Sequence, residues 1–222
     1  MKEIVAAELA KRIKDGDRIG VGTGTTVDAA LVKIGERIKA EDLNVQVVPT
    51  SLQSAWKCHE IGLTVLYPAY NDMLSWGFDG ADAVDKNLWL IKGKGGAMLQ
   101  EKILAARCKK FIIIVDESKV VDDLAGSCPI PVEVIPEALC VAKKGLHELG
   151  AKEIVMRPAT GKHGPIITEA GNIILDVKFS AIKSELEKQI KSVVGVVESG
   201  LFMGYAHEVI VASAGGLKSL AN

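Results

Sequence analysis

The stretch IGVGTGTTVDAALVKIGERI, residues 19–38, predicts a short aliphatic strand that passes through a glycine-rich turn directly into an amphipathic helix. The turn is Gly22-Thr23-Gly24-Thr25-Thr26. After it, apolar residues recur with the i, i+3, i+4, i+7 spacing of a helix face, at Val27, Ala30, Leu31, Ile34 and Ile38. A strand followed at once by such a helix is the first half of a β-α-β unit, so this stretch indicates a parallel sheet.

The same alternation continues on both sides of this stretch. Strands are predicted over residues 45–48, 63–66, 74–78 and 111–115, and helices over the first 13 residues, 51–61 and 97–107. Repeated units of this kind predict an α/β fold in which helices cover a parallel sheet.

The pattern changes at Pro129 and Pro131, which exclude helix and favour an extended crossing segment. Beyond them we predict strands over 132–135, 153–156, 166–168 and 173–177, and helices over 137–149 and 182–190, with further core strands over 195–197 and 209–212. We therefore expect two domains. The first comprises residues 1–126 with 200–222, and the second, residues 127–199, is a small α+β domain.

Composition excludes several classes of protein. The 222 residues carry 27 basic and 28 acidic side chains, a net charge of −1, so binding of nucleic acid by bulk neutralisation of phosphates is not expected. The N-terminus has no apolar run typical of a signal peptide, and the longest aliphatic cluster, 111–115, is too short to span a membrane. We expect a cytoplasmic protein without a membrane partner. Its four cysteines are expected to be reduced and buried: Cys58, Cys108, Cys128 and Cys140.

Three stretches could carry chemistry, and the first is the glycine turn at residues 22–26. Glycines let a ligand approach the backbone, and the N–H groups of the following helix favour an anion. The dinucleotide pattern G-x-G-x-x-G fails, and the phosphate-binding Walker pattern lacks its lysine, so a compact phosphate monoester fits best. The alternative is a tight turn in which Thr25 or Thr26 only caps the helix.

The second stretch is Asp79-Gly80-Ala81-Asp82, directly after the predicted strand 74–78. Ligands of parallel sheets bind at the carboxyl ends of the strands, so both carboxylates are expected at the same crevice as the glycine turn. They either act on sugar hydroxyls and protons or form a turn and a helix cap.

The third stretch runs from Lys92 through a glycine loop to Glu101 and Lys102. All helical neighbours of Glu101 three or four positions away are apolar, so we expect its carboxylate to be partly desolvated. Desolvation raises the pKa of a carboxyl group and makes it a better base near neutral pH. In the alternative, Glu101 reaches solvent or pairs with Lys102 or Arg107.

Taken in order, these stretches resemble ribose-5-phosphate isomerase type A. The resemblance extends over nearly the whole chain through DESK at 116–119, PIPVEVIP at 129–136, GNIILD at 171–176 and GLF at 200–202. It implies a Rossmann-like domain completed by the C-terminal segment, a small ferredoxin-like domain, and a homodimer or homotetramer. It also implies interconversion of ribose 5-phosphate and ribulose 5-phosphate.

The resemblance implies roles for individual residues. We expect Glu101 to be the base, Lys92 with the backbone of Gly93, Lys94 and Gly95 to stabilise negative charge, and Asp79 and Asp82 to hold sugar hydroxyls and assist ring opening. The remaining substrate-binding residues are expected to be Thr23, Gly24, Thr25, Thr26, Gly80, Ala81, Lys119 and Lys2. Since Lys92 and the loop supply the electrophile, no metal or other cofactor is expected.

Two positions depart from the family pattern. The family usually has an acidic residue where this chain has Ala83, and Asp85 is the nearest carboxylate that could take over. Lys94 occupies a position where the family often has glycine.

The alternative functions are a sugar-phosphate sensor without chemistry and a related sugar-phosphate deaminase or CoA transferase. Only about 18 residues precede the first predicted strand, too few for the DNA-binding helices of a typical sensor.

Overall fold

The structure is a computed structural model that describes residues 2–67 and 73–221. Contacts divide the chain into two compact units. The first comprises residues 1–81, 100–120 and 204–222, and the second comprises 82–99 and 121–203. Residues 82–99 thus cluster with the second unit, while the predicted domain division at residues 127 and 200 stays a prediction.

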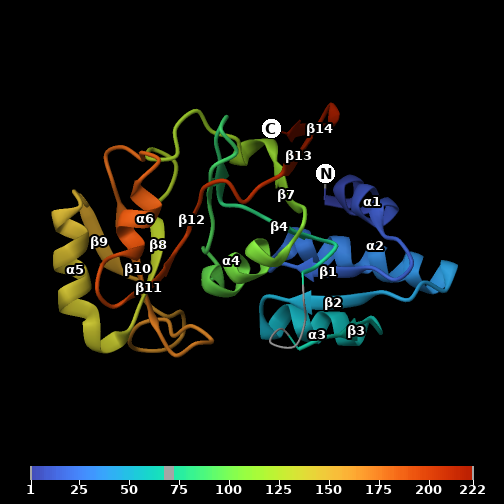
Figure 1. Cartoon of the computed structure of the whole chain (residues 1–222), viewed down its shortest axis with the longest axis horizontal. Coiled ribbons are helices and arrows are strands. Elements are labelled where there is room, and N and C mark those ends of the chain that lie inside the picture. The colour runs from blue at the N-terminus through green and yellow to red at the C-terminus, as the bar shows by residue number, and fades with distance from the viewer. Residues whose placement is uncertain (1, 68–72, 222) are drawn as a thin grey trace. The chain divides into compact units, whose positions relative to one another are not determined.

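The first unit is built on a seven-stranded sheet with the order β14-β13-β7-β4-β1-β2-β3 (Figure 1). Its strands are β1 (Arg18–Val21), β2 (Gln46–Pro49), β3 (Thr64–Val65), β4 (Trp76–Asp79), β7 (Phe111–Asp116), β13 (Glu208–Ser213) and β14 (Gly216–Ala221). All neighbours are parallel except β13 and β14. The chain fills the sheet outward from β1 in both directions, so the switch point, where ligands of such sheets bind, lies between β1 and β4.

Helices cover both faces of this sheet. They are α1 (Lys2–Arg12), α2 (Thr25–Glu41), α3 (Leu52–Glu60) and α4 (Met98–Arg107). Ile19 and Val21 point into a core shared with α1, α2 and α3. On the other face, a Cβ on Gly20 would lie 2.8 Å from Leu104, and one on Gly77 would lie 2.5 Å from the Cys108 sulfur. Glycines on β1 and β4 therefore let α4 approach the sheet closely.

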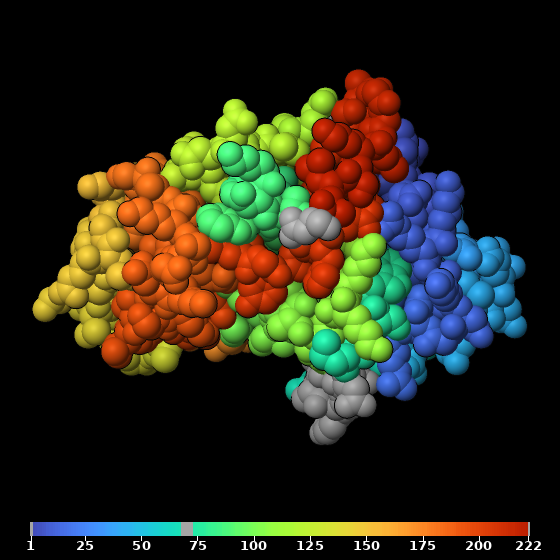
Figure 2. All heavy atoms as spheres, turned by 45° about the horizontal axis from the view of Figure 1, so that its top comes forward, coloured from blue at the N-terminus to red at the C-terminus, as the bar shows by residue number. Residues whose placement is uncertain are grey.

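The C-terminal hairpin β13–β14 lies beside the N-terminal helix α1, where Figure 2 shows red atoms against blue. Arg12 of α1 donates two hydrogen bonds, of 2.8 and 2.9 Å, to the Glu208 carboxylate on β13. Lys110 lies 2.7 Å from the same carboxylate, and Ser219 donates to it at 3.0 Å. The Arg12 hydrogen bonds lower the pKa of Glu208 to about 2. This network ties the two ends of the chain to the sheet.

The Glu208 network makes stability depend on pH. A carboxyl group whose pKa is depressed by folding stabilises the native state above its unfolded value and loses that effect as the pH falls through the folded value. We expect Glu208→Gln to lower the free energy of unfolding at pH 7 by roughly 2 kcal/mol, and the difference from wild type to shrink between about pH 5 and pH 2. Urea unfolding at several pH values measures it, with Glu137→Gln on the exposed surface as control. A difference independent of pH would contradict the account.

The second unit contains a four-stranded antiparallel sheet with the order β11-β8-β10-β9. Its elements are β8 (Ile130–Val134), α5 (Leu139–Glu148), β9 (Glu153–Met156), β10 (Ile173–Lys178), α6 (Leu186–Lys191) and β11 (Val196–Ser199). This β-α-β-β-α-β succession is ferredoxin-like. A second, three-stranded sheet has the order β12-β6-β5 and comprises β12 (Leu201–Phe202), β6 (Leu90–Ile91) and β5 (Ala83–Val84).

Three details of the sequence prediction are wrong. Residues 166–168 form no strand, because their pairing is limited to single bridges such as Ile167 with Ile173, and Thr168 closes a turn by accepting the Gly171 N–H. Helix α6 begins at Leu186, after a turn, and not at residue 182. Of the four cysteines expected to be buried, Cys140 is exposed and Cys128 is only partly buried, whereas burial raises the pKa of both Cys58 and Cys108 to about 12. Within residues 2–67 and 73–221, no helix has the length and apolar character that crossing a membrane takes.

Candidate active site

The carboxyl ends of β1 and β4 bring the glycine turn and Asp79 together in the first unit. The Asp79 side chain is fully buried, and its Oδ1 accepts N–H groups of Thr23 at 3.1 Å and Gly80 at 2.7 Å. A Cβ on Gly22 would lie 2.0 Å from the Asp79 Cγ. Only glycine at position 22 therefore lets this carboxylate lie under the turn, so Asp79 orders the turn as well as occupying the switch point.

A cluster of hydroxyl groups, which the sequence analysis missed, supports the turn from the end of β2. The Thr23 hydroxyl lies 2.9 Å from that of Thr50 and donates to Ser51 at 2.8 Å. Ser54 donates to the Gly22 carbonyl at 2.7 Å, and Ser51 caps α3 by accepting the Ser54 N–H. Thr23 is thus held in place by side chains of the neighbouring strand end.

Helix α2 begins at the turn without a side-chain cap. Its N-cap residue is Gly24, with φ 133°, and neither threonine that follows it caps the helix, in contrast to the alternative considered above. The Thr25 hydroxyl accepts a hydrogen bond of 2.7 Å from Lys2 Nζ. Uncapped N–H groups, the positive end of the helix dipole and a lysine next to Thr25 together suit an anion.

Helix α4 carries Glu101, whose side chain is only 4% exposed. The helix runs from Glu101 through Leu104, which packs on Gly20 of β1, toward Cys108, which packs on Gly77 of β4. Leu74, which precedes β4, forms an isolated β-bridge with Cys108, so the C-terminal end of α4 lies near the start of β4. The helix therefore runs opposite to the strands, and Glu101 near its beginning lies toward their carboxyl ends. Its burial excludes the alternative in which it reaches solvent.

Lys119 follows β7 in a single 3-10 turn, Glu117–Lys119, at the same edge of the sheet. The turn is capped by Asp116, whose pKa is lowered mainly by the hydrogen bond from the Ser118 hydroxyl. Gly80, like Lys119, is partly exposed. The strand ends of β1, β4 and β7 thus each carry one of the predicted motifs.

In the second unit, Asp82 and Lys92 flank paired strands. Ala83 pairs with Ile91 in an antiparallel register, so Asp82, which precedes one strand, lies opposite Lys92, which follows the other. The Asp82 N–H donates to the Ile91 carbonyl at 2.8 Å. Lys92 is 3% exposed, and its Nζ lies 5.6 Å from the ring centroid of Phe202, a distance within the range of cation–π attraction.

The loop after Lys92 turns on glycines. Gly93 and Gly96 have φ of +99° and +87°, and the Gly96 N–H donates to the Gly93 carbonyl at 2.9 Å. The Lys94 N–H donates to Asp82 Oδ2 at 2.9 Å, which makes Asp82 part of the loop's support. The Lys94 side chain is exposed.

Asp85 orders a local hairpin, and its compensating role for Ala83 stays a prediction. Its carboxylate accepts the N–H groups of Asn87 and Trp89, both at 2.9 Å, and so orders the hairpin between β5 and β6. Ala83 is buried in the apolar core of the second unit. Alanine at this position therefore adds no charge to that core.

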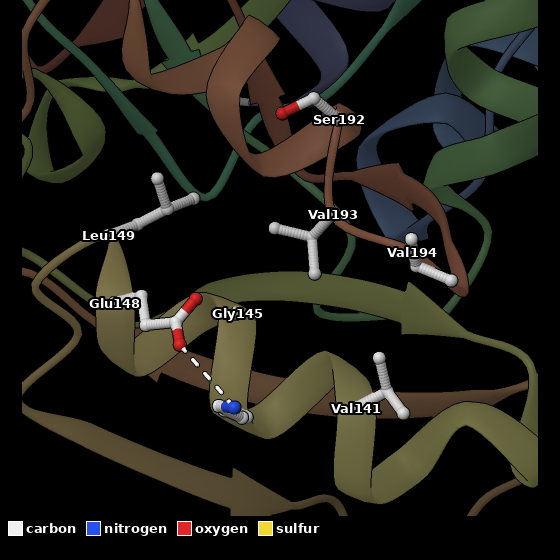
Figure 3. A pocket seen from close by; sticks show the side chains of 8 residues that line it. Val141, Gly145, Glu148, Leu149, Ser192, Val193 and Val194 are labelled. Carbon is white, nitrogen blue, oxygen red and sulfur yellow. Dashed lines mark ion pairs between the residues drawn. The ribbon is translucent and has the colours of Figure 1, made fainter.

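A pocket of about 420 Å³ opens between α5 and the segment after α6 (Figure 3). It is lined by Val141, Lys144, Gly145, Glu148, Leu149, Ser192, Val193 and Val194. None of the predicted site residues lines this pocket, so it carries no part of the catalytic interpretation. Among the residues that the structure describes, no group of three or more His, Cys, Asp or Glu side chains is arranged to hold a metal ion.

A doubly wound sheet with a glycine turn and a buried carboxylate at its switch point defines an α/β enzyme that takes a small anionic ligand. The sequence model of the ribose 5-phosphate isomerase A (phosphoriboisomerase A) family matches residues 46–216. A ribose-5-phosphate isomerase A of Methanothermobacter thermautotrophicus is 42% identical over 99% of this chain and 97% of its own length. One of a Synechococcus strain is 41% identical over 97% of this chain and 94% of its own.

Solved structures agree with this likeness. The ribose 5-phosphate isomerase A of Methanocaldococcus jannaschii has a TM-score of 0.95 at 41% identity and matches 100% of this chain and 98% of its own. A D-ribose-5-phosphate isomerase in complex with phospho-erythronic acid has a TM-score of 0.96 at 38% identity, with 100% and 97% covered. The chain belongs to the ribose 5-phosphate isomerase A family and is an isomerase, which confirms the predicted resemblance and fold class.

Proposed function

We propose that this chain interconverts D-ribose 5-phosphate and D-ribulose 5-phosphate through an enediolate, with Glu101 as the base. The observation that carries this assignment is the burial of a carboxylate on α4, toward the carboxyl ends of β1 and β4. Burial disfavours the charged form of a carboxyl group and so makes its carboxylate a stronger base.

The reaction moves one proton between two carbons. Glu101 takes the proton from C2 of the open-chain aldose, the electron pair of that bond forms a C1–C2 double bond, and negative charge gathers on O1. The proton on Glu101 exchanges in part with solvent while the enediolate exists, and Glu101 then protonates C1. The proton of the C2 hydroxyl passes to O1, and the ketose results. One carboxylate on one face of the enediolate serves both steps, so Glu101 is regenerated in each cycle.

Lys92 and the loop of residues 93–95 stabilise the charge on O1 in this proposal. A buried ammonium group is a strong partner for a developing oxyanion, because little water competes for it. Asp82 orders the loop through the Lys94 N–H, and with Asp79 it holds sugar hydroxyls during ring opening. The electrophile is then supplied by the protein, without a metal. Phospho-erythronic acid, bound by a relative, has a carboxylate in place of the reacting carbons, and we propose that this chain binds it as an analogue of the enediolate.

The phosphate is held by residues 23–26 at the start of α2, with Lys2 and Lys119 supplying positive charge. We expect Thr26→Val to raise KM for ribose 5-phosphate about tenfold, because one phosphate contact is lost. The slow reaction with unphosphorylated ribose should stay within about twofold of wild type, since that substrate never makes the contact. Initial rates with both sugars measure this, with Thr64→Val on exposed β3 as control. An equal loss with both sugars would show that Thr26 supports folding instead.

The experiment that tests the function is a coupled assay of ribose 5-phosphate conversion. The proposal expects turnover, whereas a sensor would bind the sugar phosphate without converting it. A deaminase would release ammonia from an amino-sugar phosphate, and a CoA transferase would form a covalent adduct on a glutamate. Mass spectrometry of the protein during turnover distinguishes the last case, because the isomerase forms no covalent bond to Glu101.

We further propose that the protein works in the cytoplasm as a homodimer or homotetramer in which residues 127–199 supply contacts between copies. Support for such contacts comes from exposed apolar side chains in this segment, including Val141 and Val194 beside the pocket of Figure 3. Light scattering of the purified protein measures the assembly, and a monomer at all concentrations would contradict it.

A further inference from the structure

Arg157 directly follows β9 and lies outside every motif quoted above. Its side chain is 15% exposed and reaches two parts of the second unit at once. Nε donates to Asp176 Oδ2 at 2.9 Å, and Nη2 binds Oδ1 of the same carboxylate. Nη1 donates to the Gly93 and Lys94 carbonyls, both at 2.9 Å. The guanidinium thus clamps the loop after Lys92 onto β10.

This clamp sets the direction of the loop's N–H groups. In a trans peptide the C=O and N–H bonds point in opposite directions, so carbonyls held by Arg157 turn the N–H groups of Lys94 and Gly95 away from it. The Lys94 N–H meets Asp82 on that opposite side. For Gly95, none of the groups in residues 2–67 and 73–221 accepts its N–H, and a Cβ there would meet nothing within 4 Å. An outward-facing backbone donor is thereby left for a ligand.

The charges of Arg157 and Asp176 are also suited to holding the loop of residues 93–95. Asp176 compensates the guanidinium charge, so the pair adds no net charge beside the loop, while the hydrogen bonds from the cation strengthen the polarisation of the two peptides. Lysine could not replace this arrangement, because one ammonium group cannot hold a carboxylate with two parallel bonds and two carbonyls in a fixed plane.

We propose that Arg157, held by Asp176, is a positioning residue for the isomerisation: it fixes the loop of residues 93–95 so that the Gly95 N–H meets the charge of the enediolate. The inference rests on the proposed function, because it takes this loop as part of the charge-stabilising site. Arg157 acts through the loop and touches no reacting atom.

The test compares Arg157→Lys and Asp176→Asn with Lys162→Met, a control that removes a positive charge from the exposed segment between β9 and β10. We expect kcat with ribose 5-phosphate to fall roughly 30- to 100-fold in Arg157→Lys, because misplacement of a catalytic group by about 1 Å costs about that much. KM should change less than threefold. Asp176→Asn should also lower kcat with little change in KM, but by a smaller factor. The control Lys162→Met should have the wild-type kcat and KM.

Hydrogen exchange of the Lys94 amide, which is bonded to Asp82, provides a readout that does not depend on activity. We expect exchange at least tenfold faster in Arg157→Lys, with exchange in β8 and β10 unchanged. An Arg157→Lys variant with wild-type kcat and wild-type loop exchange would overturn the proposal. Faster exchange throughout the second unit would also overturn it, because Arg157 would then serve only to stabilise the fold. If the wild type failed to convert ribose 5-phosphate, the proposed function would fail while the loop exchange still decided whether Arg157 positions the loop.

Discussion

Glu101→Gln is expected to lower kcat for ribose 5-phosphate by 10² to 10⁴-fold, the usual contribution of a general base. Glutamine keeps the shape of the side chain and its place on α4 but cannot accept the C2 proton. KM and the unfolding temperature should stay close to wild type, because sugar and phosphate are bound by other groups. Steady-state rates in both directions measure the effect.

The matched control is Glu148→Gln, the same chemical change on the exposed face of α5. It should leave kcat within twofold of wild type. If Glu101→Gln retained more than about a tenth of the wild-type rate, Glu101 would be a structural residue and the base would have to be sought elsewhere.

Lys92→Met is expected to lower kcat by about 10² to 10³-fold, the range found when a donor to an oxyanion is removed. Methionine preserves the apolar stem beside Phe202 but removes the charge. The affinity for phospho-erythronic acid should fall at least tenfold, since its carboxylate stands in for the charged enediolate. Competition by inorganic phosphate should be unchanged, because the phosphate is bound by residues 23–26.

Lys152→Met, a change on the exposed surface of the second unit, serves as control for the loss of one positive charge. A Lys92→Met enzyme with unchanged kcat but a tenfold higher KM would contradict the assignment. Lys92 would then contribute to substrate binding in the ground state and not to stabilisation of the enediolate.

The parallel sheet could be predicted because most of its strands can be recognised from their local sequence. Residues 19–22, 45–48 and 111–115 are short, mostly apolar runs bounded by turns, and helix α2 shows a complete apolar face. The strands β5, β6 and β12 were missed, since each has two residues and such a length carries no periodicity. β14 was also missed, because it is an edge strand with mostly exposed residues and no clear alternation.

Part of the candidate site could likewise be predicted from local sequence, and part could not. Glycines and carboxylates directly after buried strands are visible in the sequence, and they led to Gly22, Asp79 and the loop after Lys92. The hydroxyl cluster of Thr50 and Ser54 and the clamp of Arg157 were not found, because their contacts to other elements join residues 19 to 64 positions apart in the chain. Such contacts depend on sheet order and register, which no local pattern encodes.

The most direct test of the account follows deuterium during turnover in D₂O with unlabelled ribose 5-phosphate. Proton transfer by Glu101 through an enediolate predicts solvent deuterium at C1 of ribulose 5-phosphate, detected by NMR, and its near absence with Glu101→Gln over the same period. Ribulose 5-phosphate formed at the wild-type rate without any deuterium at C1 would contradict the account, because the hydrogen would then have moved directly between the carbons. Incorporation by Glu101→Gln at the wild-type rate would contradict it equally.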